Sequence, residues 1–280
     1  MRRTIAKRQT YWARLFLLTI VANLIFPIPI PLDLLLMAAP LALMLVPPMT
    51  TQRAPSEVGA PVRGRWVVLN SPGSAVPSHG TKAYGQMYAV DLLHPSDEQA
   101  PSVGWGVRGR LPESYSSFGE PIRAMKSGTI VSVQDSQRDH RGRNTWPLLI
   151  YMLTLEGFLR VLIGTSRVLG NHAVIEHDDG TFAAYAHLQQ ASATVRAGQR
   201  VHQGQHLARV GNTGNTSEPH LHVQLMDRAL PAAAAGIPML WPRTVIDPTH
   251  SDPRWTTGRP KATAQPAFPA NGQIFRTTED

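Results

Sequence analysis

The stretch that decides the fold is residues 211–225, GNTGNTSEPHLHVQL. A loop of Gly, Asn, Thr and Ser ends at Pro219 and runs into a segment in which polar and apolar residues alternate. Because side chains alternate faces along a strand, His220 and His222 share one face and the Leu and Val residues share the other. Two imidazoles on one face are able to hold a metal ion, or one holds it while its neighbour moves protons. The alternative is a pair of solvated histidines on an edge strand.

The composition limits the classes of partner. The chain has 280 residues, a formal charge of +8 and no cysteine. Its charge favours anionic surroundings, such as phospholipid head groups or wall polymers. No zinc-finger spacing, ribonucleoprotein aromatic motif or basic helix accompanies the charge, so we expect no nucleic-acid partner. The absence of cysteine excludes disulfides and thiolate zinc sites.

The N-terminal region reads as a basic segment followed by a membrane segment. Residues 1–14 carry five positive charges and no acid, and residues 15–49 carry one charge, Asp33. Three prolines interrupt the apolar block, which is either one irregular span or two short helices, Leu15–Phe26 and Leu34–Val46. Two such helices reach roughly 18 and 20 Å, short of the roughly 30 Å hydrocarbon core. We therefore predict one net crossing, with the following domain on the extracytoplasmic side and in contact with membrane lipid.

The remaining chain predicts one mainly β domain. Residues 50–66 read as a polar linker, and residues 67–246 contain short apolar strands separated by glycine-containing turns, including Asp178-Asp179-Gly180. This pattern predicts a compact antiparallel sandwich or barrel. Residues 247–280 hold repeated Pro, Thr and Gly with few apolar residues, which predicts a disordered tail.

One segment differs from the β pattern. Residues 146–163, WPLLIYMLTLEGFLRVLI, have the length of a helix and only two charged side chains, Glu156 and Arg160. We expect an inserted apolar helix. It either packs on the sheet or lies at the surface of the bilayer that the N-terminal segment enters.

Candidate metal ligands also lie outside residues 211–225. A catalytic zinc site needs about three protein ligands, usually His and carboxylate, and one open position. His222 is one candidate. Asp91 lies in a strand that is otherwise apolar, YAVDLL, where a carboxylate must be ion-paired or metal-bound. His79 lies in the preceding loop, SHGT.

These residues carry a family resemblance. His79 and Asp91, then YAHL (185–188), then HLH (220–222) occur in this order, with VRAGQRVHQGQ (195–205) between the last two. Together they resemble the lysostaphin/LytM-type zinc metallopeptidases, peptidase family M23, over roughly residues 77–227. The resemblance implies that one zinc ion is bound by His79, Asp91 and His222. It also implies that His187 and His220 flank the reacting water.

The spacing of the first two ligands departs from the usual pattern of the family, His-x-x-x-Asp. Eleven residues separate His79 from Asp91 in this chain. Some members of the family carry such a loop, so Asp91 is retained. His94 and Asp97 are the alternative ligands.

The resemblance implies an endopeptidase that cleaves peptide bonds of bacterial cell-wall peptidoglycan. The chain has no HExxH motif, so a histidine rather than a glutamate is expected to accept the proton of the attacking water. The residues do not decide which of His187 and His220 is the base. Two other classes stay open: a catalytically inactive wall-binding or amidase-activating module, and a phosphocarrier barrel with similar Gly-Gln turns.

Overall fold

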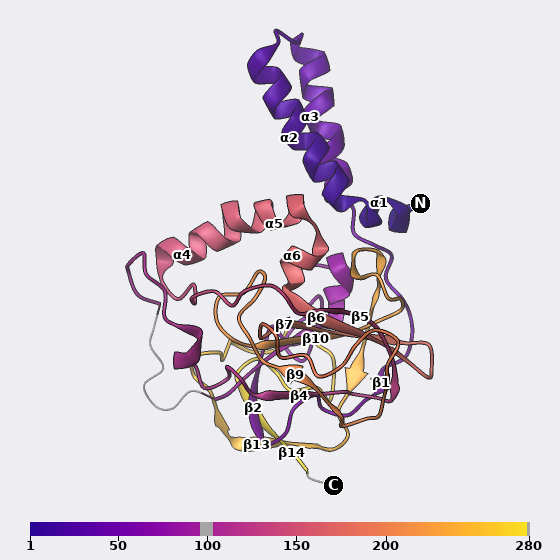
Figure 1. The fold of residues 1–280 in the computed structure, drawn as a ribbon, viewed down its shortest axis with the longest axis vertical. Coiled ribbons are helices and arrows are strands. Elements are labelled where there is room, and N and C mark those ends of the chain that lie inside the picture. The colour runs from indigo at the N-terminus through magenta and orange to yellow at the C-terminus, as the bar shows by residue number, and fades with distance from the viewer. Residues whose placement is uncertain (96–102, 279–280) are drawn as a thin grey trace.

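One long, mainly antiparallel sheet forms the body of the protein (Figure 1). The computed structural model describes residues 1–95 and 103–278. In these residues the strands of the large sheet follow the order β13-β14-β2-β3-β10-β7-β6-β5-β8, with β11 paired to β10. Their bounds are β2 (Arg65–Leu69), β3 (Val90–Leu93), β5 (Gly128–Gln134), β6 (Asn171–His177), β7 (Phe182–Leu188), β8 (Arg200–Val201), β10 (Leu221–Met226), β11 (Gly236–Ile237), β13 (Thr244–Ser251) and β14 (Gln273–Thr277).

A small sheet lies against the large one. It pairs β4 (Pro121–Arg123) with β9 (His206–Arg209), and its Ile122 and Leu207 belong to the same buried cluster as Leu92 and Tyr185 of the large sheet. The backbone N–H of Met125 also donates to the Tyr185 hydroxyl at 2.7 Å. The prediction of a mainly β, antiparallel domain is confirmed.

The domain begins earlier than predicted. β1 (Ser56–Glu57) pairs in parallel with β12 (Met239–Leu240), and Val58 and Val62 are buried in the core. Assigning all of residues 50–66 to a linker was therefore wrong. Two isolated valines among polar and small residues give no periodic signal, although each fills a gap at the edge of the core.

The predicted disordered tail is also wrong for residues 247–278. β14 pairs with β2 inside the large sheet, and Phe275 is 0% exposed. β13 pairs in turn with β14. The average composition of this segment conceals one short strand, Gln273–Thr277, whose two apolar residues are enough to complete the core.

The N-terminal segment forms a helical hairpin that rises from one end of the domain (Figure 1). Its helices are α2 (Gln9–Ile25) and α3 (Ile30–Met44), and α1 (Arg2–Lys7) precedes them. The break between α2 and α3 falls at Pro27 and Pro29, because proline lacks the N–H that would continue a helix. Near this turn, the Asn23 side-chain amide donates to the Asp33 carboxylate.

Both ends of the hairpin return to the domain. Arg3 in α1 forms an ion pair with Asp227 of the domain at 2.6 Å, and the Gln9 amide donates to the Met44 carbonyl at 3.1 Å, which holds the start of α2 beside the end of α3. The observed hairpin is the two-helix alternative and does not support one net crossing. At 1.5 Å per residue, the 17 residues of α2 and the 15 of α3 reach about 25 and 22 Å.

Residues 146–163 form the expected helix, in three consecutive parts: α4 (Trp146–Tyr151), a π-helical turn η3 (Met152–Glu156) and α5 (Gly157–Ile163). α6 (Thr165–Leu169) follows, and short 3₁₀ turns lie at η1 (Ala83–Tyr88), η2 (Pro112–Ser114) and η4 (Pro231–Ala233). Among the described residues, this helix alone is long and apolar enough to cross a membrane, judged by length and composition. Only 6% of it is buried, so the alternative of a helix packed on the sheet is not observed.

Candidate metal centre and active site

Strand pairing brings Asp91 and His222 together. β10 lies between β3 and β7, and in the antiparallel β3–β10 ladder His222 is directly opposite Asp91. The next pair, Val223 and Val90, points to the opposite face and is fully buried in the core. The alternation of β10 therefore places its apolar side chains in the core and His222 in the site.

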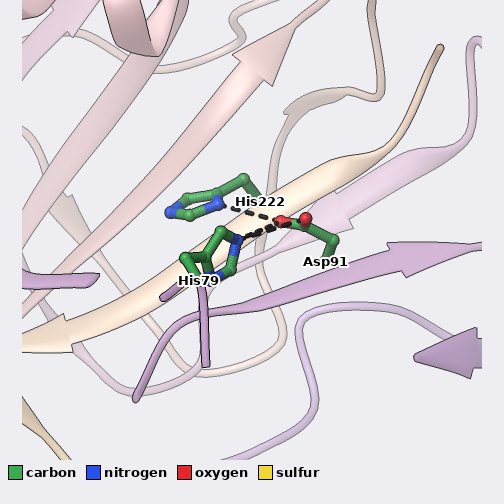
Figure 2. Close-up of side chains that lie close together, drawn as sticks. All are labelled: His79, Asp91 and His222. Atoms are coloured by element: carbon green, nitrogen blue, oxygen red, sulfur yellow. Dashed lines mark hydrogen bonds and ion pairs between the residues drawn. The ribbon is translucent and has the colours of Figure 1, made fainter. Parts of the chain in front are cut away.

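The loop before β3 adds the third side chain (Figure 2). The Nε2 of His79 lies 3.2 Å from both carboxylate oxygens of Asp91, and the Nδ1 of His222 lies 2.9 Å from Asp91 Oδ1. The ligand atoms that these three residues offer all lie within 4.8 Å of one another. The three predicted ligands thus meet at one point, and they come from a loop and two neighbouring strands.

The long spacing between His79 and Asp91 is taken up by η1. Tyr84 and Gly85 have φ values of 54° and 76°, which turn the chain sharply within that segment. A Cβ on Gly85 would also meet the Gln224 side chain at 2.9 Å. The extra residues therefore form a compact turn that returns the chain to β3.

The alternative ligands do not join this group. The His94 ring packs edge-on against Trp66, with centroids 4.4 Å apart, and its Nε2 lies 3.9 Å from Glu120. Asp97 lies outside the described residues.

A layer of hydrogen bonds orients the ligands. The Gln224 side-chain nitrogen donates to the Tyr84 carbonyl, so its oxygen faces His222 and accepts the Nε2 proton at 3.0 Å. Nδ1, which hydrogen-bonds Asp91 Oδ1 at 2.9 Å, is then the atom that a metal ion would take. Asn70 donates to Asp91 Oδ2 at 2.8 Å, and the Ser78 hydroxyl lies 3.2 Å from His79 Nδ1. Sequence reasoning missed these partners. The signal for Gln224 was its position two residues after His222, on the same face of the strand.

The donor set fits a zinc ion. Two imidazole nitrogens and one carboxylate oxygen are the usual protein ligands of a catalytic zinc site, which leaves a fourth position open. Metal-binding histidines generally donate their other N–H to an oxygen, as His222 does to Gln224. Each of the three candidate ligands has such an outer partner here.

The charge state of Asp91 suits this role. Burial by itself raises the pKa of a carboxyl group, but the neighbouring His79 and His220, with hydrogen bonds from His222 and His79, hold the pKa of Asp91 well below its usual range. Burial also lowers the pKa of His79, against the attraction of Asp91. The site therefore presents an ionised carboxylate beside an imidazole that favours its neutral form.

His187 and His220 lie beside this group. Their Nδ1 atoms are each 2.8 Å from a backbone carbonyl oxygen, that of Thr213 for His187 and that of Glu218 for His220. A carbonyl only accepts, so both Nδ1 atoms carry a proton and both Nε2 atoms have a lone pair. The His220 Nε2 lies 3.6 Å from Asp91 Oδ1, and the rings of His187 and His220 are 4.8 Å apart.

A backbone reversal directs His187 into the site. Ala186 pairs with His222 in the β7–β10 ladder, so strict alternation would place His187 on the core face with Tyr185. The φ of His187 is 63°, in the left-handed region, which breaks the alternation at the end of β7. Burial, then His220 and His222, lower the pKa of His187 well below its ordinary value, so the side chain is neutral and able to accept a proton.

A cavity of about 530 Å³ contains these five side chains. Other parts of its wall come from η1, from the loop 215–218, and from Met152, Leu153 and Val161 of the apolar helix. Gln9, at the base of the hairpin, also lines it. A peptide entering the cavity would meet the metal ligands and both further histidines.

The C-terminal segment supports the loop before β10. The Arg254 guanidinium donates to both carboxylate oxygens of Glu218, whose side chain is almost fully buried. The Glu218 carbonyl accepts the proton of His220 Nδ1. Sequence reasoning missed this contact, because it assigned Arg254 to a disordered tail.

We expect Gln224→Leu to weaken zinc binding, because His222 would lose the acceptor that holds its Nδ1 lone pair in the site. Loss of such an outer partner typically costs about 10–100-fold in metal affinity. The measurement is the zinc Kd, by competition with a chelator. Gln224→Glu loses the bond to the Tyr84 carbonyl but keeps an oxygen acceptor for His222, so it should bind zinc more tightly than the Leu variant. Equal zinc Kd values for Gln224→Leu and wild type would contradict this role.

Comparison with known proteins supports the resemblance over part of the chain. Residues 154–233 match the model of Peptidase family M23. This segment contains His187, His220 and His222, while His79 and Asp91 lie before it. The resemblance to this family is thus supported over residues 154–233.

Two relatives and one solved structure are similar to this chain. The Peptidoglycan DD-endopeptidase ShyA of Vibrio cholerae is 42% identical over 72 residues, 25% of this chain and 16% of ShyA. The Cell division protein DipM of Caulobacter vibrioides is 45% identical over 56 residues, 20% of this chain and 9% of DipM. A zinc-containing peptidase from Vibrio cholerae aligns with a TM-score of 0.28 and 20% identity, over 51% of this chain and 37% of that structure. The chain spans less than a fifth of the length of these two relatives.

Proposed function

We propose that this chain is a zinc-dependent endopeptidase of family M23 that cleaves peptide bonds of bacterial peptidoglycan. The observation that carries the proposal is the convergence of His79, Asp91 and His222 beside His187 and His220 in one cavity. The match to the M23 family model and the similarity to a peptidoglycan DD-endopeptidase support the substrate class.

The residues divide the chemistry as follows. His79, Asp91 and His222 would hold one zinc ion. When bound, the ion would act as a Lewis acid and make water nucleophilic near neutral pH. The water oxygen adds to the peptide carbonyl carbon while Nε2 of His187 or His220 accepts the water's proton. The same imidazole then gives that proton to the leaving nitrogen as the C–N bond breaks. The other imidazole is placed to stabilise the charge that develops on the carbonyl oxygen.

The alternative is an inactive module of the same fold, which binds the wall or activates an amidase. The presence of all five polar side chains, each with its outer hydrogen bonds, favours the enzyme. A binding module has no need for two further imidazoles beside the ligand group.

We also propose that the hairpin anchors the protein in a membrane, with the domain on the extracytoplasmic side. Helices of about 25 and 22 Å, joined at a proline-rich turn, reach into a hydrocarbon core of about 30 Å and return to the same side. Peptidoglycan lies outside the cytoplasmic membrane, which favours this side. The basic α1 then lies with the domain, at the level of the lipid head groups.

Metal removal tests the proposed function directly. Dialysis of the full chain against a zinc chelator should abolish release of peptides from purified peptidoglycan, and added zinc should restore it, because water loses its Lewis acid in the stripped protein. Products are separated by chromatography and identified by mass. Unchanged hydrolysis by protein shown to be free of metal would contradict the proposal.

A further inference from the structure

The helix of residues 146–163 carries an unusual number of exposed apolar side chains. Large apolar side chains along it are more than a third exposed: Trp146, Ile150, Tyr151, Leu153, Leu155, Leu159 and Ile163. Its mean hydropathy is 1.5, and only 6% of it is buried. A helix on the surface of a globular domain normally shows the opposite pattern, with its apolar face buried and its polar face in water.

The charged side chains of this helix point toward the protein. Glu156 forms ion pairs with Arg143 at 2.8 Å and with Arg160 at 2.6 Å, and all three side chains are at least four-fifths buried. Met152, one turn before Glu156, is also buried. The Glu156–Arg143 pair therefore joins the polar side of the helix to the preceding loop, while the large apolar side chains stay exposed.

The apolar face is continuous with the hairpin. Arg14 in α2 donates from Nε to the Leu162 carbonyl at 2.8 Å and from a terminal nitrogen to the Ile163 carbonyl at 3.4 Å, so the hairpin is joined to the end of α5. In Figure 1 the hairpin rises from the side of the domain that carries α4 and α5. A membrane entered by the hairpin would thus meet the helix as well.

Aromatic side chains extend this face. Trp105 is 83% exposed, and its loop is held against the start of the helix by a hydrogen bond from the Trp146 N–H to the Gly104 carbonyl at 2.9 Å. With Trp146 and Tyr151, it gives three exposed aromatic rings on the helix and its adjoining loop. Trp and Tyr are enriched at the boundary between lipid and water.

We propose that the helix Trp146–Ile163 lies in the head-group region of the bilayer that the hairpin enters, with its apolar face in lipid. Interfacial helices embed about 5–10 Å into the boundary between head groups and acyl chains. The basic side chains of α1 and the net charge of +8 complement anionic lipid. Glu156 and Arg160, near the middle of the helix and paired toward the domain, are incompatible with a spanning orientation.

This placement determines where the active site opens. Met152, Leu153 and Val161 of the same helix line the cavity that holds the five polar side chains, as does Gln9 at the base of the hairpin. The cavity therefore lies at the lipid surface, and its substrate is a peptide held close to the membrane. The inference rests on the proposed membrane anchoring and does not require that the site be catalytic.

Site-specific quenching in vesicles tests the inference. The chain has no cysteine, so single cysteines accept an environment-sensitive fluorophore at one position each in the full-length protein. The three variants are Leu155→Cys on the helix, Leu24→Cys near the tip of the hairpin, and Val245→Cys on β13 as the control. These side chains are 55%, 82% and 58% exposed. In Figure 1, β13 lies at the end of the domain away from the hairpin. Vesicles of phosphatidylglycerol and phosphatidylethanolamine carry nitroxide quenchers at two acyl-chain depths.

We expect the shallow quencher to remove most of the fluorescence of the Leu155 probe and the deeper quencher to remove most of that of the Leu24 probe. Neither quencher should affect the Val245 probe. A quenched Leu24 probe beside an unquenched Leu155 probe would overturn the inference and leave the anchoring intact. If neither the Leu155 probe nor the Leu24 probe is quenched, both the inference and the membrane anchoring are overturned. If the emission of the Leu155 probe shifts to the blue without quenching, another protein surface, such as a second copy of the chain, covers the helix. That result would also overturn the inference. Equal quenching at Val245 and Leu155 would indicate adsorption without orientation and would also overturn it.

Discussion

Asp91→Asn is expected to leave the protein without stoichiometric zinc and without measurable hydrolysis of peptidoglycan. Asp91 is the only carboxylate of the three candidate ligands, and His79 and His222 both contact it. Asn keeps the shape and one oxygen but removes the negative charge that balances the metal ion. The fold should survive, because the amide still offers an acceptor to Asn70. Elemental analysis should show about one zinc per wild-type chain and far less in the variant.

The matched control is Asp247→Asn on β13, which also removes one carboxylate but lies in a strand outside the site. It should keep full zinc and full activity. Retention of one zinc per chain by Asp91→Asn would remove Asp91 from the metal site. His222→Ala should lose zinc in the same way as Asp91→Asn, since it removes the Nδ1 ligand.

The second large effect is a loss of hydrolysis without a loss of zinc. His220 and His222 share one face of the chain, but His220 Nδ1 is bound to the Glu218 carbonyl and its Nε2 lies 3.6 Å from Asp91. His220→Ala removes a proton-transfer group and leaves the three candidate ligands in place. General acid–base groups contribute about 10²–10⁴-fold to the rate. We expect a loss of that size in kcat, with unchanged zinc content.

His187→Ala should behave in the same way. If both imidazoles act on one water, the double variant should lose less than the product of the two single effects. Measuring zinc content and hydrolysis together on each variant separates the two roles. Zinc loss on His220→Ala would reverse the assignment within His220-Leu221-His222. Full activity with full zinc would exclude His220 from the reaction.

Much of the site could be predicted from sequence because its geometry follows from strand alternation. The pattern from Leu221 to Leu225 places His222 opposite the core, and an acid at position 91 in an apolar strand requires a partner. His187 is different. The resemblance identified it, whereas alternation alone would have placed it in the core, because the φ of 63° at this position has no signature in the sequence.

The features that sequence reasoning missed depend on contacts between distant segments. Gln224, which orients His222, is held by the Tyr84 carbonyl 140 residues earlier in the chain, and Arg254 supports the loop before β10 from 36 residues further along. β14 completes the sheet with two apolar residues, too few to stand out from a Pro- and Thr-rich segment. The apolar block at residues 15–49 led us to predict one net crossing rather than a hairpin, because the return of α1 to the domain depends on the ion pair of Arg3 with Asp227.

The most direct test of a zinc endopeptidase is mass analysis of the fragments that the full-length chain releases from purified peptidoglycan, with zinc content measured on the same samples. The wild type should contain about one zinc per chain and release fragments with new peptide termini, while His222→Ala should contain little zinc and release none. A wild-type protein that binds one zinc per chain and cleaves no wall preparation would contradict the account and identify the domain as an inactive module.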